Sequence, residues 1–211
     1  LYNRFFRKFN NYPPQFLAVS SKQKEEFQKK VNMCSDDVRI VRLHSYDYEN
    51  FLRAEPYKND GKPYCVFLDP YIPFHPDLII DADRKIDSKK YYFEMKEYFK
   101  CISNAYNCEV IVASHPRADE SIQKRNWGDY KVVYSKTAEL VKGAVLVLSH
   151  FSNSTALAVM SYKPVVVIVN DELQRVDYFY RRCKKYVDLL SFKMVLKPED
   201  VRELNVDINR S

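Results

Sequence analysis

The chain has 211 residues, of which 46% are hydrophobic, 15% aromatic and 29% charged, and its formal net charge is +6. This composition excludes wholesale disorder, because it supplies enough apolar residues for a buried core. The length fits one large domain, or one domain with part of another. Only three glycines occur, so a tight turn around a phosphate group would have to be built from hydroxyl side chains instead.

The cysteine pattern and the apolar runs restrict the cellular setting. Five cysteines occur without a Cys-x-x-Cys pair, which predicts a reduced, cytoplasmic protein without a disulfide framework or zinc site. The longest apolar runs are far shorter than the roughly 20 residues of a membrane-spanning helix. No secretory signal is expected in Leu1 to Phe16, which lacks an apolar core. Because the first residue is not methionine, we expect a fragment of a longer protein.

The first 60 residues predict a small α/β segment. The expected elements are a strand over Gln15–Ser20, a polar helix to about Val31 capped by Ser20, and a strand over Val38–Leu43. Two prolines and a glycine in Glu55–Pro63 predict a linker. Residues 1–60 supply too little chain to close a domain alone, so we expect them to pack on the main domain or on another copy.

From residue 61 to residue 211 the pattern predicts a Rossmann-like α/β domain with a doubly wound parallel sheet. Continuous apolar strands alternate with helices, as expected for a sheet buried on both faces. The expected strands are Tyr64–Leu68, Glu109–Ala113, Lys131–Tyr134, Ala144–Ser149 and Pro164–Val169. The expected helices are Ser88–Ala105, Thr137–Lys142 with Gly143 at its end, Ser154–Ser161 and Glu172–Val187. Ligands bind such sheets beyond the carboxyl ends of the strands.

A hydroxyl-rich turn follows the strand that ends at Ser149. Ser152, Ser154 and Thr155 lie within four residues, at the start of a predicted helix. Unpaired backbone N–H groups at a helix start, together with hydroxyl donors, can bind a phosphate. Capping the helix needs only one hydroxyl, so simple capping and phosphate binding both remain open.

Two further groups of side chains follow strands of this sheet. His115, Pro116 and Arg117 come directly after a buried strand. The histidine can contact a phosphate or a leaving group, and the arginine can bind a phosphate through two parallel hydrogen bonds. Asp69, His75 and Asp77 belong to a proline-rich loop after the first strand of the domain. Asp69 is our candidate general base, and His75 and Asp77 are candidates for contacts to the acceptor or the donor sugar; a rigid corner without such a role is the alternative.

These motifs resemble those of one enzyme class. His115-Pro116, followed by the Ser152–Thr155 turn, is similar to paired motifs of bacterial sialyltransferases and polysialyltransferases, in which the histidine and a serine pair face the phosphate of a cytidine nucleotide. The stretch Ser114–Asp171 also resembles capsule and lipopolysaccharide transferases, and the likeness covers roughly residues 64–190. Here Asn153 separates the two serines, and the acidic acceptor-base motif is not evident, so CMP-, UDP- and GDP-sugars all remain candidate donors.

The resemblance implies the C-terminal, donor-binding half of a GT-B glycosyltransferase, with residues 1–60 from the acceptor-side domain. It implies transfer of a sugar from a nucleotide-sugar to a growing polysaccharide or lipid-linked acceptor, with peripheral contact to the inner face of the inner membrane and no nucleic-acid partner. No cofactor or metal is expected, because Asp81-Ala82-Asp83 does not follow a clear strand. His115 would stabilise the charge that develops on the leaving phosphate.

Three other functions fit parts of the sequence. An epimerase-like enzyme would use the same phosphate turn without an acceptor. A nucleic-acid-binding module could use the Tyr- and Lys-rich stretch Lys89–Lys100, although its apolar spacing fits a helix core better. A degenerate domain would bind no nucleotide. Trp127 is interpreted as a core residue in preference to a base-stacking one, and His44 as a local structural residue.

Overall fold

The computed structural model describes residues 15–20, 25–27, 38–44, 46–75 and 85–208. Contacts divide the chain into two compact units, Leu1–Glu49 and Asn50–Ser211. This division falls before the boundary expected after residue 60. The reason is that the backbone N–H of Tyr57 donates to the carbonyl of Glu139, and Lys142 donates to the carbonyl of Ala54, so these linker residues pack on the second unit.

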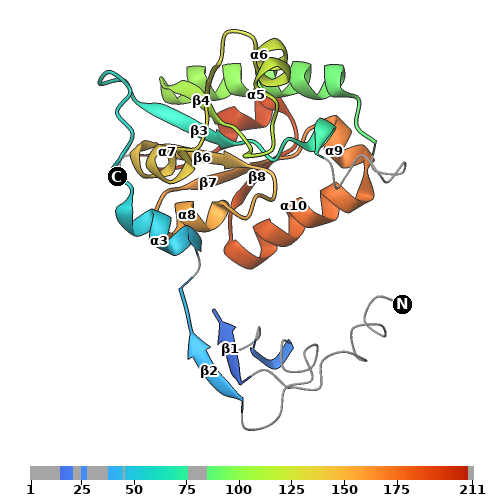
Figure 1. Cartoon of the computed structure of the whole chain (residues 1–211). Helices are drawn as coiled ribbons and strands as arrows, with labels where there is room; N and C mark the ends of the chain where they lie inside the picture. The colour runs from blue at the N-terminus through green and yellow to red at the C-terminus, as the bar shows by residue number, and fades with distance from the viewer. Residues whose placement is uncertain (1–14, 21–24, 28–37, 45, 76–84, 209–211) are drawn as a thin grey trace. The chain divides into compact units, whose positions relative to one another are not determined.

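The second unit is built on one six-stranded parallel sheet in the order β5-β4-β3-β6-β7-β8 (Figure 1). Successive strands progress outward from β3 in one direction and from β6 in the other, which is the strand order of the Rossmann fold. The direction of winding therefore changes between β3 and β6. The strands are β3 (Tyr64–Leu68), β4 (Glu109–Ala113), β5 (Lys131–Val133), β6 (Leu146–Ser149), β7 (Val165–Ile168) and β8 (Lys193–Val195).

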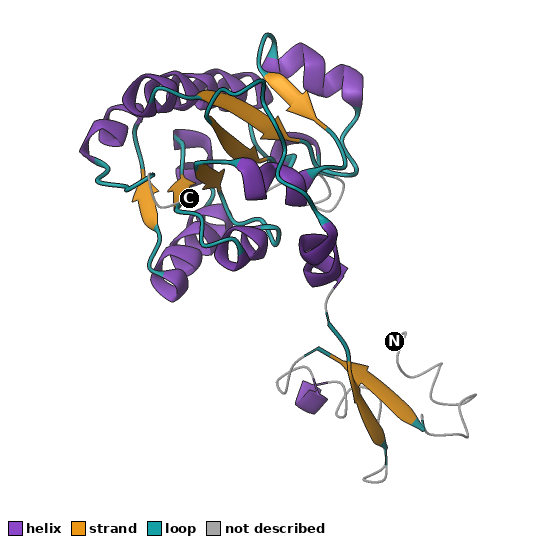
Figure 2. Cartoon of the chain, turned by 90° about the vertical axis from the view of Figure 1, so that its left-hand side faces the viewer, coloured by secondary structure: helices purple, strands orange, loops and turns teal. Residues whose placement is uncertain are grey.

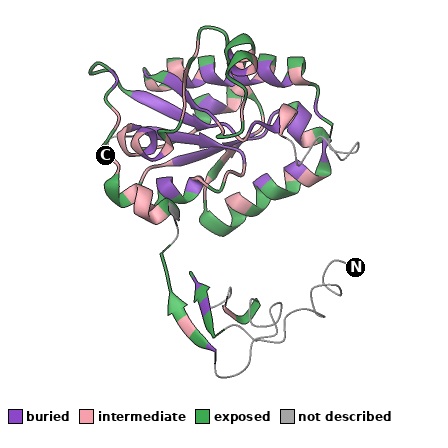
Figure 3. Ribbon diagram, in the orientation of Figure 1, coloured by how far each residue is buried: buried purple, intermediate pink, exposed green. Residues whose placement is uncertain are grey.

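Helices cover both faces of this sheet. Helices α5 and α6 lie on one side, whereas α8 and α10 lie on the other (Figure 1). The residues of β3, β6 and β7 are all buried, in agreement with their continuous apolar sequences (Figure 3). The helices are α5 (Ser88–Tyr106), α6 (Glu120–Trp127), α7 (Thr137–Gly143), α8 (Thr155–Met160), α9 (Asp171–Arg175) and α10 (Asp177–Leu190), with 3-10 turns η1 (Ile72–Phe74) and η3 (Pro198–Glu203).

An aromatic cluster fills the core beneath α5. Trp127 is fully buried, and its ring centroid lies 5.3 Å from that of Phe99 and 5.7 Å from that of Phe67. Trp127 is thus a core residue, as the sequence indicated. Tyr91, Tyr92, Tyr98 and Phe99 of Lys89–Lys100 are buried too. Phe93 is the one exposed aromatic residue of this stretch, so the stretch does not present a series of aromatic rings for stacking with bases.

The first unit contains a small parallel pair of strands. Strands β1 (Phe16–Val19) and β2 (Arg39–Arg42) pair in parallel, with Phe16 opposite Arg39. Leu17, Val19 and Val38 form a core cluster of their own in this unit. The polar helix expected to run to about Val31 is described only at residues 25–27, which are helical (Figure 2). The strands expected in this region are confirmed.

Several elements differ from the expected ones. The predicted helix Glu172–Val187 is two helices, α9 and α10, because Val176 adopts an extended conformation between them. Helix α3 (Tyr46–Arg53), helix α6 and strand β8 were not predicted. Helix α6 is short and strongly polar, and β8 has only three residues, one of them buried. Neither carries a hydrophobic period long enough to be recognised.

Gly143 ends α7, as expected, and its lack of a side chain also permits a close packing contact. It is the last residue of α7, and a Cβ atom at this position would collide with the Tyr64 hydroxyl and the carbonyl oxygen of Tyr57. The Tyr64 hydroxyl is fixed by donating to the carbonyl of Leu140 at 2.8 Å.

We expect Gly143→Ala to lower the free energy of unfolding by roughly 1–3 kcal/mol, as measured by chemical denaturation. Gly61→Ala is the control: a Cβ there meets open space, but the positive φ angle adds its own cost of about 1 kcal/mol. A fully neutral Gly143→Ala would contradict this assignment.

Candidate functional site

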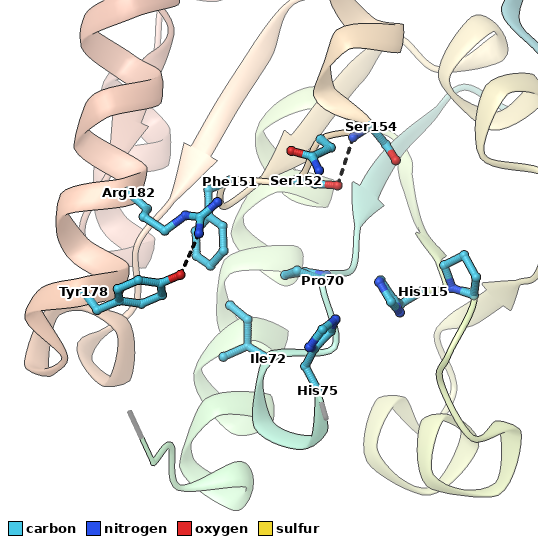
Figure 4. Close-up of a pocket in the computed structure, with 11 residues that line it drawn as sticks. Pro70, Ile72, His75, His115, Phe151, Ser152, Ser154, Tyr178 and Arg182 are labelled. Carbon is cyan, nitrogen blue, oxygen red and sulfur yellow. Dashed lines mark hydrogen bonds between the residues drawn. The ribbon is translucent and has the colours of Figure 1, made fainter. Parts of the chain in front are cut away.

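A cavity lies at the carboxyl edge of the sheet, where the direction of winding changes. Its volume is about 440 Å³, within the range of small-molecule sites. Loops after β3, β4 and β6 line it together with one face of α10 (Figure 4). The lining residues are Pro70, Ile72, His75, His115, Pro116, Phe151, Ser152, Asn153, Ser154, Tyr178 and Arg182.

The structure brings together most of the side chains singled out from the sequence. His75, His115, Pro116, Ser152 and Ser154 all line this cavity. Arg117 and Thr155 do not line it, since Arg117 is exposed outside it and Thr155 is buried beneath the turn. Asp77, and the Asp81-Ala82-Asp83 segment, lie outside the described residues.

The two histidines of the cavity lining contact each other. The ring centroids of His75 and His115 are 5.0 Å apart, with the planes at 73° (Figure 4). The Nδ1 atom of His115 accepts a hydrogen bond from the backbone N–H of Arg117 at 3.2 Å. Because Nδ1 is the acceptor, the neutral ring carries its proton on Nε2. The loop thereby presents His115 as a donor through Nε2.

The hydroxyl-rich turn is held by its own hydrogen bonds. The Oγ atom of Ser149 lies 3.0 Å from Oγ1 of the buried Thr155, and Ser152 Oγ accepts from the backbone N–H of Ser154 at 3.3 Å. Backbone N–H groups of residues 155–157 donate to carbonyls three residues earlier. These N–H groups are therefore not the unpaired donors expected from the sequence. The hydroxyl of Ser152 accepts within the turn and keeps its own hydrogen as a donor.

Arg182 contributes a cation that the sequence analysis did not single out. Its Nη1 donates to the hydroxyl of Tyr178 at 2.6 Å. The guanidinium carbon lies 5.0 Å from the ring centre of Phe151 and 5.5 Å from that of Tyr178. The four-residue spacing of Tyr178 and Arg182 on a helix after the fifth strand of the sheet was a signal for this pair. The contacts hold the cation at the cavity wall (Figure 4).

Asp69 points into the protein. The side chain is buried, and its carboxylate accepts hydrogen bonds from Gln123 at 2.8 Å, Trp127 at 3.4 Å and the backbone N–H of Tyr71 at 2.8 Å. Burial raises the pKa of Asp69, and the hydrogen bonds from Gln123, the Tyr71 N–H and Trp127 oppose that rise. This geometry fits a carboxylate that shapes the loop after β3. Its role as general base stays a prediction.

His150 supports the loop after β6 from within the core. The ring is fully buried, with Nε2 2.9 Å from the Tyr91 hydroxyl and Nδ1 2.6 Å from the carbonyl oxygen of Ile168. A carbonyl can only accept, so Nδ1 carries the proton and Nε2 accepts from Tyr91. Burial lowers the pKa of His150 to about 4, against the opposing effect of the Ile168 carbonyl. The residue is therefore neutral and ties the end of β6 to the end of β7.

The cavity combines donors and a cation. Among the residues that the structure describes, none that lines it is acidic. Arg182, His115 and the serine hydroxyls can together hold a phosphate group through charge-assisted hydrogen bonds. Within the described part of the chain, no cluster of three or more His, Cys, Asp or Glu side chains is suited to bind a metal ion. No helix among these residues has the length and apolar character to cross a bilayer.

The fold is thus an α/β Rossmann-like one, with a site suited to anions at the point where its winding reverses. No protein-family model matches the sequence, and the comparison with curated proteins gives no match. Solved structures do resemble it. CalG4, the calicheamicin glycosyltransferase, has a TM-score of 0.46 at 11% identity, covering 94% of this chain and 45% of that protein.

Two further structures show a similar degree of likeness. A UDP-GlcNAc 2-epimerase from Methanocaldococcus jannaschii, solved with UDP-GlcNAc and UDP, has a TM-score of 0.45 at 13% identity and covers 92% of this chain and 56% of that one. The glycosyltransferase SnogD from Streptomyces nogalater has a TM-score of 0.41 at 12% identity, covering 84% of this chain and 50% of that one. The chain spans about half the length of these proteins, and the likeness concerns the backbone arrangement alone.

Proposed function

We propose that this chain is the donor-binding half of a GT-B glycosyltransferase, and that the cavity binds the phosphate of a nucleotide-sugar. One observation carries the proposal: His115, Ser152, Ser154 and Arg182 surround a single cavity at the switch point of a parallel sheet. Ligands of open α/β sheets bind in that crevice. A cation and several donors, without an acidic side chain among the described lining residues, suit an anionic ligand.

The chemistry of the proposed reaction requires positive potential at this place. The bond between the anomeric carbon and the phosphate oxygen breaks, and the nucleotide leaves with the electron pair. The acceptor oxygen bonds to the carbon and gives up its proton to a general base, for which Asp69 is our candidate. Preorganised donors stabilise the growing negative charge on the phosphate. His115 Nε2 and the Arg182 guanidinium would supply them, without a metal ion, in this proposal.

The donor and the acceptor are parts of the proposal that rest on sequence resemblance. The His-Pro pair and the serine turn favour a CMP-sugar, with UDP- and GDP-sugars as the alternatives. The likeness of Ser114–Asp171 to capsule and lipopolysaccharide transferases favours a growing surface polysaccharide or a lipid-linked glycan as acceptor. Such an enzyme would work in the cytoplasm, in peripheral contact with the inner membrane.

A panel of CMP, UDP, GDP and their sugars tests the proposed function by thermal unfolding. A nucleotide at 100 times its dissociation constant should stabilise the fold by about 2.7 kcal/mol. We expect one nucleotide to raise the midpoint, and its sugar to be consumed only with an acceptor. Conversion of the sugar without an acceptor would instead indicate an epimerase. The absence of stabilisation by every nucleotide would contradict the proposal.

Arg182→Ala should weaken binding of that nucleotide by about 10- to 100-fold, since hydrogen bonds to charged groups contribute about 1.5–3 kcal/mol. Arg182→Lys should recover only part of the loss, because lysine cannot form two parallel bonds to a phosphate. Titration calorimetry measures both. The matched control is Arg181→Ala, which removes a neighbouring cation whose Nε donates to Asp177. Equal affinities in the two alanine variants would exclude Arg182 from the site.

A further inference from the structure

A second, apolar cavity adjoins the first one. Its volume is about 470 Å³, and it lies between α8 and α10. The lining residues are Asn153, Thr155, Ala156, Val159, Met160, Tyr186, Leu189 and Leu190. We call this cavity the α8–α10 groove. Its aliphatic side chains are unusually open for apolar residues: Leu189 is 69% exposed, Val159 47% and Leu190 43%.

The groove continues from the phosphate cavity along shared elements. Asn153 lines both cavities. On α10, Tyr178 and Arg182 line the phosphate cavity, whereas Tyr186 and Leu190 line the groove at the same four-residue spacing. Residues spaced in this way share one helix face. One face of α10 therefore passes from a charged end to an apolar end, next to α8 (Figure 1).

The lining restricts what the groove can hold. Thr155 is buried and its hydroxyl contacts Ser149, and most of the other lining side chains are aliphatic. A nucleobase placed there would leave much of its polar edge without partners, which costs free energy. A hydrocarbon chain has no such requirement and gains from each methylene that it buries. The exposed amide of Asn153, at the junction, can donate to and accept from hydroxyl groups.

We propose that the α8–α10 groove binds the hydrocarbon chain of an amphiphilic glycan acceptor, whose sugar head lies at Asn153 beside the phosphate cavity. This inference rests on one part of the proposed function, namely that the phosphate cavity holds the nucleotide-sugar. It places the acceptor's chain on the donor-binding unit itself. The chain anchors the acceptor, and the head group meets the donor at the boundary between the apolar and the charged ends of the α10 face.

Alkyl glucosides with hexyl, heptyl and octyl chains, each below its micelle concentration, are the probes. Binding is followed by titration calorimetry with glucose as the reference. Each added methylene should tighten binding by up to about fourfold, and glucose should bind far more weakly. Leu189→Asn and Val159→Thr should abolish the chain-length dependence. The control, Phe93→Asn, changes a side chain that is 68% exposed on α5 and should keep that dependence.

Nucleotide binding by the same variants separates the two proposals. Unchanged nucleotide affinity with loss of chain binding supports the groove as an acceptor subsite. If wild type binds the glucosides but no nucleotide, the proposed function fails while the chain site stands. Equal loss of nucleotide affinity in the groove variants would make the groove a base site and overturn the inference. Affinities that do not depend on chain length would also overturn the inference. In that case, loss of binding to phosphatidylglycerol vesicles in Leu189→Asn would assign the groove to a membrane surface, and loss of self-association would assign it to a second copy of the chain.

Discussion

Replacement of His115 by alanine should slow cleavage of the bond between the donor sugar and its nucleotide by about 10²- to 10³-fold. This is the usual effect of removing one preorganised hydrogen-bond donor from a site where negative charge develops. The Kd of the nucleotide itself should change by much less. His115 lines the cavity, and because its Nδ1 accepts from the Arg117 N–H, the neutral ring carries its proton on Nε2. In the proposed reaction this donor would stabilise the negative charge that accumulates on the phosphate. Steady-state release kinetics and direct titration separate the two effects.

His44→Ala is the control for this experiment, because that histidine is exposed and belongs to the first unit. It should leave both the release rate and the Kd unchanged. A His115→Ala variant that releases nucleotide at the wild-type rate would rule out the catalytic role. A parallel loss in rate and affinity would show that His115 acts in ground-state binding instead.

His150→Ala should lower the free energy of unfolding by roughly 3–5 kcal/mol at pH 7, because it leaves a cavity and removes the partners of the Tyr91 hydroxyl and the Ile168 carbonyl. The wild type should also lose stability in acid through this residue. The folded pKa is about 4 and the ordinary value is 6.5, so the unfolded chain binds the proton first as the pH falls. This contribution is complete above pH 6.5 and decreases by about 3 kcal/mol toward pH 4.

Chemical denaturation at pH 7 and at pH 4.5 measures this effect as a difference between wild type and variant. The comparison is needed because Asp69 acts with the opposite sign: its pKa is raised on folding, so its protonation favours the folded state as the pH falls. The difference in stability between wild type and His150→Ala should shrink at pH 4.5. A difference that stays constant between the two pH values would show that His150 is not buried in its neutral form.

The sheet and part of the site could be predicted because both depend on local sequence. Strands β3 and β7 are apolar throughout, and β4 and β6 are apolar except for Glu109 and Ser149 at their ends. Such apolar runs are typical of buried parallel strands. His115 and Ser152 each follow such a strand. Parallel strands end at the same edge, so the sequence already placed the two residues on one side of the sheet.

Side-chain direction and long-range partners could not be predicted. Asp69 and His150 also follow strands, but both turn inward, because Gln123, Trp127, Tyr91 and Ile168 supply hydrogen bonds from distant parts of the chain. Arg182 lies more than a turn into a helix, where a surface position is the usual expectation. Its four-residue spacing from Tyr178 predicts a contact between the two side chains, but its place in the cavity lining depends on packing against Phe151 from a distant loop.

The most direct test of the account is to locate a bound nucleotide. Backbone and side-chain NMR signals should be recorded while the nucleotide selected by thermal unfolding is titrated into the chain. We expect the largest shifts at His115, Ser152, Ser154 and Arg182, which line one cavity, and no comparable shift at Leu189 or Val159. Shifts confined to the groove, to the first unit or to the opposite edge of the sheet would contradict the proposal that this cavity is the phosphate site.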